Sequence, residues 1–189
     1  MATVPPIKVT AKSGESVTIR SANPDDARAF NDFIRESYLS NAYLVRRPEE
    51  YSTSIRDERR RLLSYADARD EIVLLAEHGD EMVGLVTTRV DRRIRARHNI
   101  ELGIALADGW RGKGLGRALM EALIRWAESV PSLRRLELHV LADNATAIAL
   151  YESLGFRPEG RRTHAVRQDD GSYVDDIIMN RWVIAPEEA

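Results

Sequence analysis

Residues 100–126, IELGIALADGWRGKGLGRALMEALIRW, predict a strand, a glycine-rich turn and an amphipathic helix in direct succession. Apolar residues alternate over 100–106, which is typical of a strand. From Leu115 they recur every three or four positions, as on a helix with one face in the core. The turn between the two carries two cations and three glycines, namely Arg111, Lys113, Gly112, Gly114 and Gly116. This succession marks the turn as a candidate binding site.

A glycine-rich turn between a strand and a helix is suited to binding an anion. Glycines let the backbone approach a phosphate closely, and the unpaired N–H groups of the first helical turn point toward it. The helix dipole favours negative charge at this end, and the two cations add to the effect. The spacing G-x-G-x-G differs from the G-x-G-x-x-G of dinucleotide-binding folds, and no Ser or Thr follows Lys113 as a P-loop requires. The turn therefore predicts a phosphate-bearing ligand held in some other way.

The rest of the chain alternates between strand and helix patterns. Strands are expected over 17–20, 72–76, 82–90, 136–141, 162–167 and 173–183, and helices from Asn23, over 54–68 and over 143–154. In the helix over 54–68, the residues expected to face the core are Ile55, Leu62, Leu63 and Ala66. This order predicts an α/β or α+β fold, with a mixed sheet covered by helices.

Length and composition indicate one globular domain. The chain has 189 residues, and we expect a flexible leader over 1–15, a single domain over 16–184 and a C-terminal tail over 185–189. The absence of cysteine excludes disulfide scaffolds, thiolate zinc sites and cysteine nucleophiles, and we expect no metal. A net charge of −2 argues against a nucleic-acid partner. With no membrane-length apolar run and no visible signal peptide, we expect a cytoplasmic protein without a membrane partner.

Two motifs resemble those of the GNAT acetyltransferase family. Arg111–Gly116, an Arg-x-x-Gly-x-Gly sequence, is similar to the family's acetyl-CoA pyrophosphate loop. Residues 144–156, NATAIALYESLGF, resemble its N-x-x-A-x-x-x-Y-x-x-x-G-F block. The resemblance covers about residues 17–183, and the closing stretch over 159–179 is similar to the small-molecule and amino-acid N-acetyltransferase branch.

The resemblance implies a fold and a cosubstrate. The fold is a mixed sheet of about seven strands flanked by about four helices, splayed between the central parallel strands 100–106 and 136–141. Acetyl-CoA is expected to lie in this opening, and a primary amine attacks its thioester directly. The absence of cysteine agrees with a reaction that forms no cysteine acyl-enzyme. The implied cofactor-binding residues are Ile104, Ala105, Leu106, Arg111, Gly112, Lys113, Gly114, Leu115, Gly116, Asn144 and Tyr151.

Tyr151 stands where the family places its general acid, which protonates the departing thiolate. A free phenol has a pKa near ~10 and a free thiol near ~8.5, so the phenol can assist the thiolate. The alternative is a helix aromatic that packs in the core. Asn144 has two roles open to it as well, because an Asn at a helix start can cap the helix, bind the cofactor, or do both.

Two residues are candidates for the general base that deprotonates the amine. Glu101 shares its strand face with the small residues Gly103 and Ala105, so we expect something other than side chains to lie against that face. The alternative for Glu101 is a structural ion pair with a nearby Arg. His139 is the competitor, because the pKa of a free imidazole near ~6.5 suits a base. A structural histidine is the alternative there.

The function implied by the resemblance is N-acetylation of a small-molecule amine or amino acid. Two alternative functions remain open: acetylation of a protein N-terminus or lysine, and non-catalytic sensing of CoA. The protein could also form a homodimer. An RNA-associated module that uses the arginines of residues 92–97 fits least, given the net charge. A cleft roofed by residues 38–51 would favour a small acceptor, whereas an open cleft above Glu101 would favour a peptide.

Overall fold

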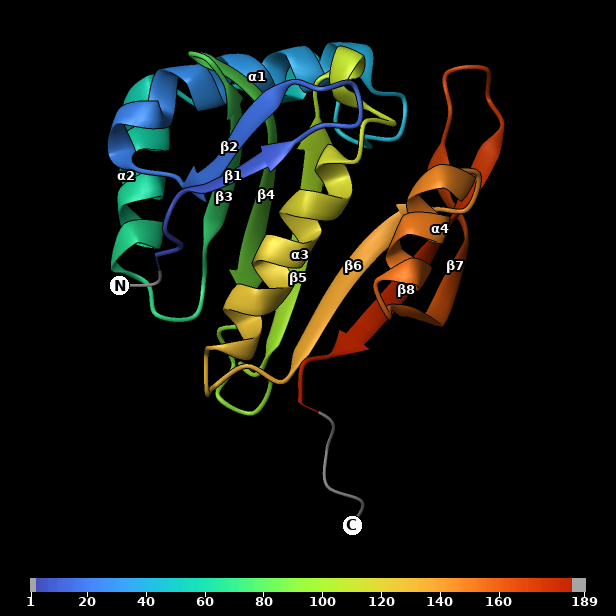
Figure 1. Ribbon diagram of the computed structural model, residues 1–189. Helices are drawn as coiled ribbons and strands as arrows, with labels where there is room; N and C mark the ends of the chain where they lie inside the picture. The colour runs from blue at the N-terminus through green and yellow to red at the C-terminus, as the bar shows by residue number, and fades with distance from the viewer. Residues whose placement is uncertain (1–2, 185–189) are drawn as a thin grey trace.

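Eight strands form one mixed sheet in the order β1-β2-β3-β4-β5-β6-β8-β7 among residues 3–184, which the computed structural model describes (Figure 1). Every neighbouring pair is antiparallel except β5 and β6. The strands are β1 (Ile7–Thr10), β2 (Ser16–Ser21), β3 (Val73–His78), β4 (Glu81–Val90), β5 (Asn99–Leu106), β6 (Arg135–Leu141), β7 (Arg157–Arg167) and β8 (Tyr173–Trp182).

Four α-helices cover the two faces of this sheet (Figure 1). They are α1 (Ala27–Ser40), α2 (Ile55–Asp67), α3 (Leu115–Glu128) and α4 (Ala145–Ser153). The larger hydrophobic cluster joins α3 and α4 to one face, and a smaller cluster joins α1 and α2 to the other. β3 shows this division clearly, because Leu74 belongs to the first cluster and Leu75 to the second. A strand buried on both faces has a continuous apolar sequence, as predicted for 72–76.

The two parallel strands at the centre of the sheet diverge. β5 and β6 are paired only at Asn99↔Arg135, Ile100↔Leu136 and Glu101↔Glu137. Beyond these positions, β5 stays paired with β4 as far as Leu106, and β6 stays paired with β8 as far as Leu141. The mixed sheet and the splay between its central parallel strands are therefore confirmed, with eight strands in place of about seven.

The expectation of a flexible leader over 1–15 is wrong, since Ile7–Thr10 forms the edge strand β1 and supplies the eighth strand. Ile7 and Val9 alternate with polar residues and pack against the larger hydrophobic cluster. This period-two pattern is short and lies among Pro, Thr and Ser residues, which hid it in the sequence. The expected tail over 185–189 lies outside the described residues. None of the helices described here is both long enough and apolar enough to cross a membrane.

The core face of α2 differs from the predicted one. Leu62 is fully buried as expected, but Ile55 and Leu63 are exposed. The buried position one turn before Leu62 is Glu58, which is 1% exposed. Its carboxylate accepts hydrogen bonds from Arg61 and Tyr51, and these offset the loss of hydration. Apolar periodicity could not identify this face because it contains a buried acid.

Two glycines on adjacent strands provide a test of packing between the sheet and α3. A Cβ on Gly84 would lie 2.7 Å from Leu106 Cδ2 and 3.2 Å from Leu119 Cδ1. A Cβ on Gly103 would meet only Thr87 Oγ1, at 3.6 Å. We expect Gly84→Val to lower the free energy of unfolding by about 1–3 kcal/mol through overpacking. Gly103→Val should change it by less than about 1 kcal/mol, and urea denaturation measures both. Equal losses would contradict the close packing at Gly84.

Candidate active site

The end of β5 lines a cavity of about 330 Å³ that also reaches α1 and α2. One wall is formed by Gly103, Ile104 and Ala105. The opposite side consists of residues from the connection between α1 and α2 and its ends, namely Tyr38, Leu44, Arg46 and Tyr51. We call this space the roofed cavity. Residues of the 38–51 segment thus contribute to its lining, and the choice between a small acceptor and a peptide stays a prediction.

A second cavity of about 590 Å³ adjoins the roofed cavity and shares Tyr38, Leu44 and Arg46 with it. It lies between the α1–α2 connection and residues 166–169, which lead into the tip of the β7–β8 hairpin. Arg47 and Asp169 form an ion pair between these two segments. The hairpin and the connection therefore meet above the splayed strands, although they are distant in sequence.

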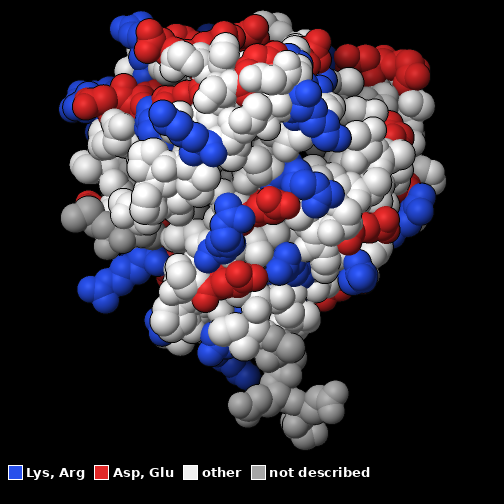
Figure 2. All heavy atoms as spheres, viewed as in Figure 1, with Lys and Arg blue, Asp and Glu red and all other residues white. Residues whose placement is uncertain are grey.

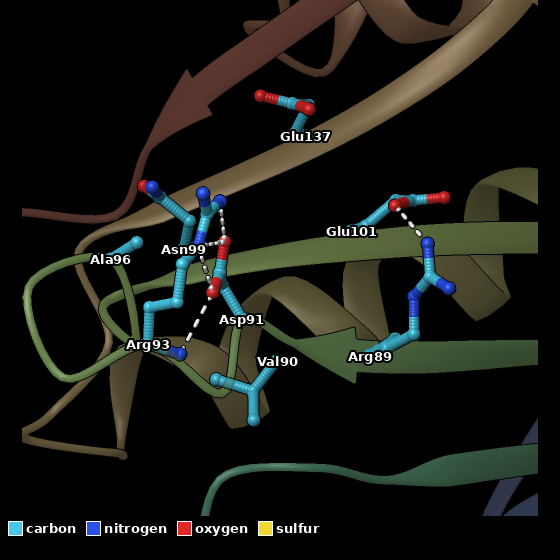
Figure 3. Close-up of a pocket in the computed structure, with 8 residues that line it drawn as sticks. All are labelled: Arg89, Val90, Asp91, Arg93, Ala96, Asn99, Glu101 and Glu137. Carbon is cyan, nitrogen blue, oxygen red and sulfur yellow. Dashed lines mark hydrogen bonds and ion pairs between the residues drawn. The ribbon is translucent and has the colours of Figure 1, made fainter.

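Glu101 lies outside the roofed cavity. It lines a third cavity of about 400 Å³ at the start of β5, together with Arg89 and Glu137 (Figure 3). Its Oε2 accepts a hydrogen bond from Arg89 Nη2 at 2.6 Å, and its side chain is 46% exposed. The structural ion pair is thus observed. Its partner is the arginine directly opposite in the β4–β5 ladder.

His139 is held by a carboxylate that the sequence did not single out. His139 Nδ1 lies 2.7 Å from Oδ2 of Asp176, a residue of β8 that is 3% exposed. Arg162 Nε donates to the same oxygen at 2.7 Å. Because an ionised carboxylate can only accept, we assign the proton to Nδ1, which leaves Nε2 as an acceptor. Nothing in the local sequence revealed this contact, since 37 positions separate the two residues.

The ring of Tyr151 packs in the core, while its hydroxyl group has no hydrogen-bond partner among the described residues. It is 7% exposed, belongs to the larger hydrophobic cluster and has its ring centroid 6.0 Å from that of Phe156. Burial raises the pKa of its phenol to about 12. Its hydroxyl makes no hydrogen bond with any residue in the described part of the chain. The group is therefore protonated at neutral pH and can donate a hydrogen bond to a ligand.

The glycine-rich turn has the backbone geometry that an anion site needs. Gly112 and Gly114 have φ angles of +73° and +88°, which side chains other than glycine rarely adopt. Gly114 directly precedes the first residue of α3, Leu115. Gly116 has a different role, because a Cβ there would lie 3.4 Å from atoms of both Leu106 and Leu150. The first two glycines shape the turn, and the third allows α3 to pack closely.

Both cations of the turn are engaged by acids. Arg111 Nη1 lies 2.9 Å from Asp108 Oδ1, and Lys113 Nζ lies 3.0 Å from Glu15 Oε1. Lys113 Nζ is also 4.8 Å from the centroid of the Trp110 ring. These pairs offset much of the positive charge predicted at the turn. The unpaired N–H groups of α3 therefore carry more of the attraction for an anion than the sequence suggested.

Lys12 adds a cation that the sequence analysis missed. Its backbone N–H donates to the carbonyl of Lys113 at 2.9 Å, which holds the β1–β2 turn against the glycine-rich turn. Its side chain crosses Gly114, with Cγ 3.6 Å from the position that a Cβ would take. Lys12 forms no ion pair within residues 3–184.

Asn144 caps α4, since its Oδ1 accepts from the N–H of Ala147 at 3.2 Å. The capping interpretation is confirmed, and its contact with a cofactor stays a prediction. Across the described residues, no group of three or more His, Asp or Glu side chains is placed to hold a metal ion.

Comparison with known proteins gives one family. Residues 32–156 match the model of the acetyltransferase (GNAT) family. A crystal structure of a GNAT-family acetyltransferase from Streptococcus pneumoniae superimposes with a TM-score of 0.85 at 29% identity, covering 88% of this chain and 99% of that one.

Two curated relatives from Escherichia coli (strain K12) share part of the sequence. L-amino acid N-acetyltransferase AaaT is 36% identical over 102 residues, which are 53% of this chain and 62% of that protein. The [ribosomal protein bS18]-alanine N-acetyltransferase is 46% identical over 76 residues, which are 40% of this chain and 50% of that protein. The matches thus span less than two thirds of the length of either relative.

Gly114 provides a test of the anion site with a matched control. Gly114→Asp and Gly114→Asn place side chains of nearly equal size at the same left-handed position, which both residue types tolerate better than most. Only aspartate adds a negative charge beside the helix N-terminus. We expect Gly114→Asp to weaken coenzyme A binding at least about tenfold more than Gly114→Asn, measured by isothermal titration calorimetry. Equal affinities would show that the turn does not bind the phosphates.

Proposed function

The chain belongs to the GNAT acetyltransferase family, and on this premise we propose that it transfers the acetyl group of acetyl-CoA directly to the primary amine of a small molecule. The observation that carries the proposal is the roofed cavity, which brings residues 38–51 over the backbone of Gly103–Ala105. A space of about 330 Å³, lined by side chains of α1, α2 and their connection, has the size of a small-molecule pocket and suits a small acceptor.

The diverging strands and the glycine-rich turn fit acetyl-CoA. Beyond Glu101, β5 has no partner strand on the β6 side, so backbone groups over 104–106 are available to hydrogen-bond a pantetheine arm. The N-terminal N–H groups of α3, with Lys12 beside them, can hold a pyrophosphate. Backbone N–H groups of β5 would also polarise the thioester carbonyl, as in an oxyanion hole.

Tyr151 acts on the leaving sulfur as a hydrogen-bond donor. A phenol of pKa about 12 is a weaker acid than a free thiol of pKa ~8.5, so complete proton transfer to the thiolate would be uphill. A hydrogen bond from the hydroxyl stabilises the developing negative charge without that transfer. The thiolate then takes its proton from solvent.

His139 is the general base in this proposal. The nitrogen of the acceptor forms a bond to the acetyl carbon as the carbon–sulfur bond breaks, and its surplus proton passes to His139 Nε2, directly or through water. Asp176 supports this role by fixing the ring and its tautomer. Neither residue lines the roofed cavity, and Glu101 is less suited because its carboxylate is already paired with Arg89.

The test of the function is release of coenzyme A thiol from acetyl-CoA with a panel of small amines, amino acids and short peptides. We expect thiol release with at least one small acceptor and little with peptides. At a ligand concentration a hundredfold above Kd, acetyl-CoA should also stabilise the fold by about 2.7 kcal/mol. Stabilisation without thiol release would indicate a non-catalytic sensor. Preference for an N-terminal peptide would favour the activity named for the bS18-modifying relative.

Tyr151→Phe isolates the hydroxyl. Phenylalanine keeps the ring and its contact with Phe156, so the melting temperature and acetyl-CoA affinity should be nearly unchanged. We expect kcat to fall by about 10²-fold, the lower end of the range for general acid catalysis, because the hydroxyl donates without full proton transfer. A kcat within about twofold of the original would assign Tyr151 to packing alone, since that is under ~1 kcal/mol of barrier.

His139→Gln and Glu101→Gln together identify the base. We expect His139→Gln to lower kcat/KM at pH 7 by about 10²–10⁴-fold and to regain activity at high pH, where the acceptor amine deprotonates unaided. Glu101→Gln should lower it by less than about tenfold. The reverse ranking in the pH–rate profiles would assign the base to Glu101.

A further inference from the structure

The roofed cavity has an excess of positive charge. Its charged lining residues are Arg46, Glu58 and Arg61, so one positive charge remains after Glu58 and one arginine are paired. The pair is formed by Glu58 and Arg61, because Arg61 Nε and Nη2 donate to Glu58 Oε1 at 2.8 and 2.5 Å. The remaining charge belongs to Arg46.

Glu58 is fully committed to its present partners. The residue is 1% exposed, and its second oxygen accepts from the Tyr51 hydroxyl at 3.1 Å. Burial and the charge of Glu58 raise the pKa of Tyr51 to about 12, so this hydroxyl remains a donor. The Arg61 guanidinium is fixed in turn, with Cζ 4.8 Å from the centroid of the Phe30 ring. Glu58 therefore cannot turn to neutralise Arg46 without abandoning a buried network.

Arg46 has no such partner. It forms no ion pair and no side-chain hydrogen bond with any residue between 3 and 184. It lines both the roofed cavity and the adjoining one, so it borders the shared space. The adjoining cavity is also lined by Glu49, Arg167 and the Arg47–Asp169 pair, whose charges cancel. The net charge of the shared space therefore stays positive.

The other walls of the roofed cavity are largely apolar. The side chains of Phe30, Ile34, Leu44 and Leu85 contribute to its lining. A ligand suited to this space has an apolar group and one anionic group. The reactive amine must also reach the wall at Gly103–Ala105, which borders the same cavity.

We propose that Arg46 binds the carboxylate of the acceptor and that the acceptor is an α-amino acid with an apolar side chain. This inference rests on the proposed function and names the acceptor class for the same site. In an α-amino acid, the amine and the carboxylate are bonded to the same carbon. The cation that binds the carboxylate and the wall at Gly103–Ala105, where the amine reacts, must therefore line the same small cavity. The planar guanidinium matches a carboxylate through two parallel hydrogen bonds.

The experiment compares L-leucine with two acceptors that lack its carboxylate, 3-methylbutylamine and leucinamide. The first amine is more basic than that of leucine and the second is less basic, so basicity alone cannot favour leucine over both. We expect kcat/KM for L-leucine to exceed that of each comparator by at least about tenfold. Arg46→Met should lower it by about 10–100-fold for leucine, as for a lost hydrogen bond to a charged group, and by less than about twofold for both comparators.

Two further variants serve as controls. Arg59 of α2 forms a solvent-exposed ion pair with Asp25. Arg59→Met should leave kcat/KM for all three acceptors unchanged within about twofold. Arg46→Lys keeps the charge without the planar fork and should recover part of the leucine activity. The melting temperature of each variant, with and without acetyl-CoA, reports on folding and cosubstrate binding separately from acceptor recognition.

The possible outcomes separate this inference from the proposed function. Equal use of leucine and both comparators, or an equal loss for all three in Arg46→Met, would overturn the carboxylate assignment and leave the acetyltransferase proposal in place. Preference for a leucyl peptide over leucine would likewise overturn it. Absence of thiol release with every acceptor would overturn both.

Discussion

The divergence of two parallel strands is the constraint on which the site depends. β5 and β6 pair at three positions and separate after Glu101↔Glu137, while each remains paired on its outer side. Backbone groups on the facing edges therefore lack a partner strand, and an unpaired buried group costs about 1–3 kcal/mol. A ligand that hydrogen-bonds this edge replaces the missing strand. The opening is thus a candidate binding site, and the strands paired on its two sides, β4 and β8, hold its edges in place.

Because side chains alternate along β5, its two faces serve different purposes. Leu102 belongs to the cluster under α3, and Leu106 lies close to Gly116 in the first turn of that helix. Gly103 and Ala105 face the opposite layer and line the roofed cavity. The glycine-rich turn continues from the same strand, so the turn and the cavity wall at Gly103–Ala105 are fixed relative to each other by one element. On the face that Figure 2 shows, acidic and basic side chains are interspersed.

The sequence predicted features that depend on contacts between neighbouring residues, but not those that depend on contacts between residues distant in the chain. The strand, turn and helix over 100–126 and the cap at Asn144 involve neighbours in sequence, and local patterns identified them. The pairs Lys113–Glu15 and Arg47–Asp169 join residues 98 and 122 positions apart, and no periodicity reports such contacts. Asp176 was missed because its partner depends on the β6–β8 register. The buried Glu58 was missed because an acid is assigned to the surface unless its partners are known.

The segment that lines the roofed cavity opposite β5 is held more firmly from α2 than from the hairpin. The Arg47–Asp169 side chains are 59% and 85% exposed, and an ion pair at that exposure is worth about 0–1 kcal/mol. Tyr51 is buried, donates to Glu58 and has its ring centroid 5.8 Å from that of Tyr38. Asn31 Nδ2 also donates to the carbonyl of Thr53 at 2.7 Å, which ties the connection to α1. The buried Glu58 of α2 thus has a structural role, because its hydrogen bond with Tyr51 anchors the segment that contains Arg46. Breaking the exposed pair with the hairpin costs little, so this side can open without disturbing the anchor at Glu58.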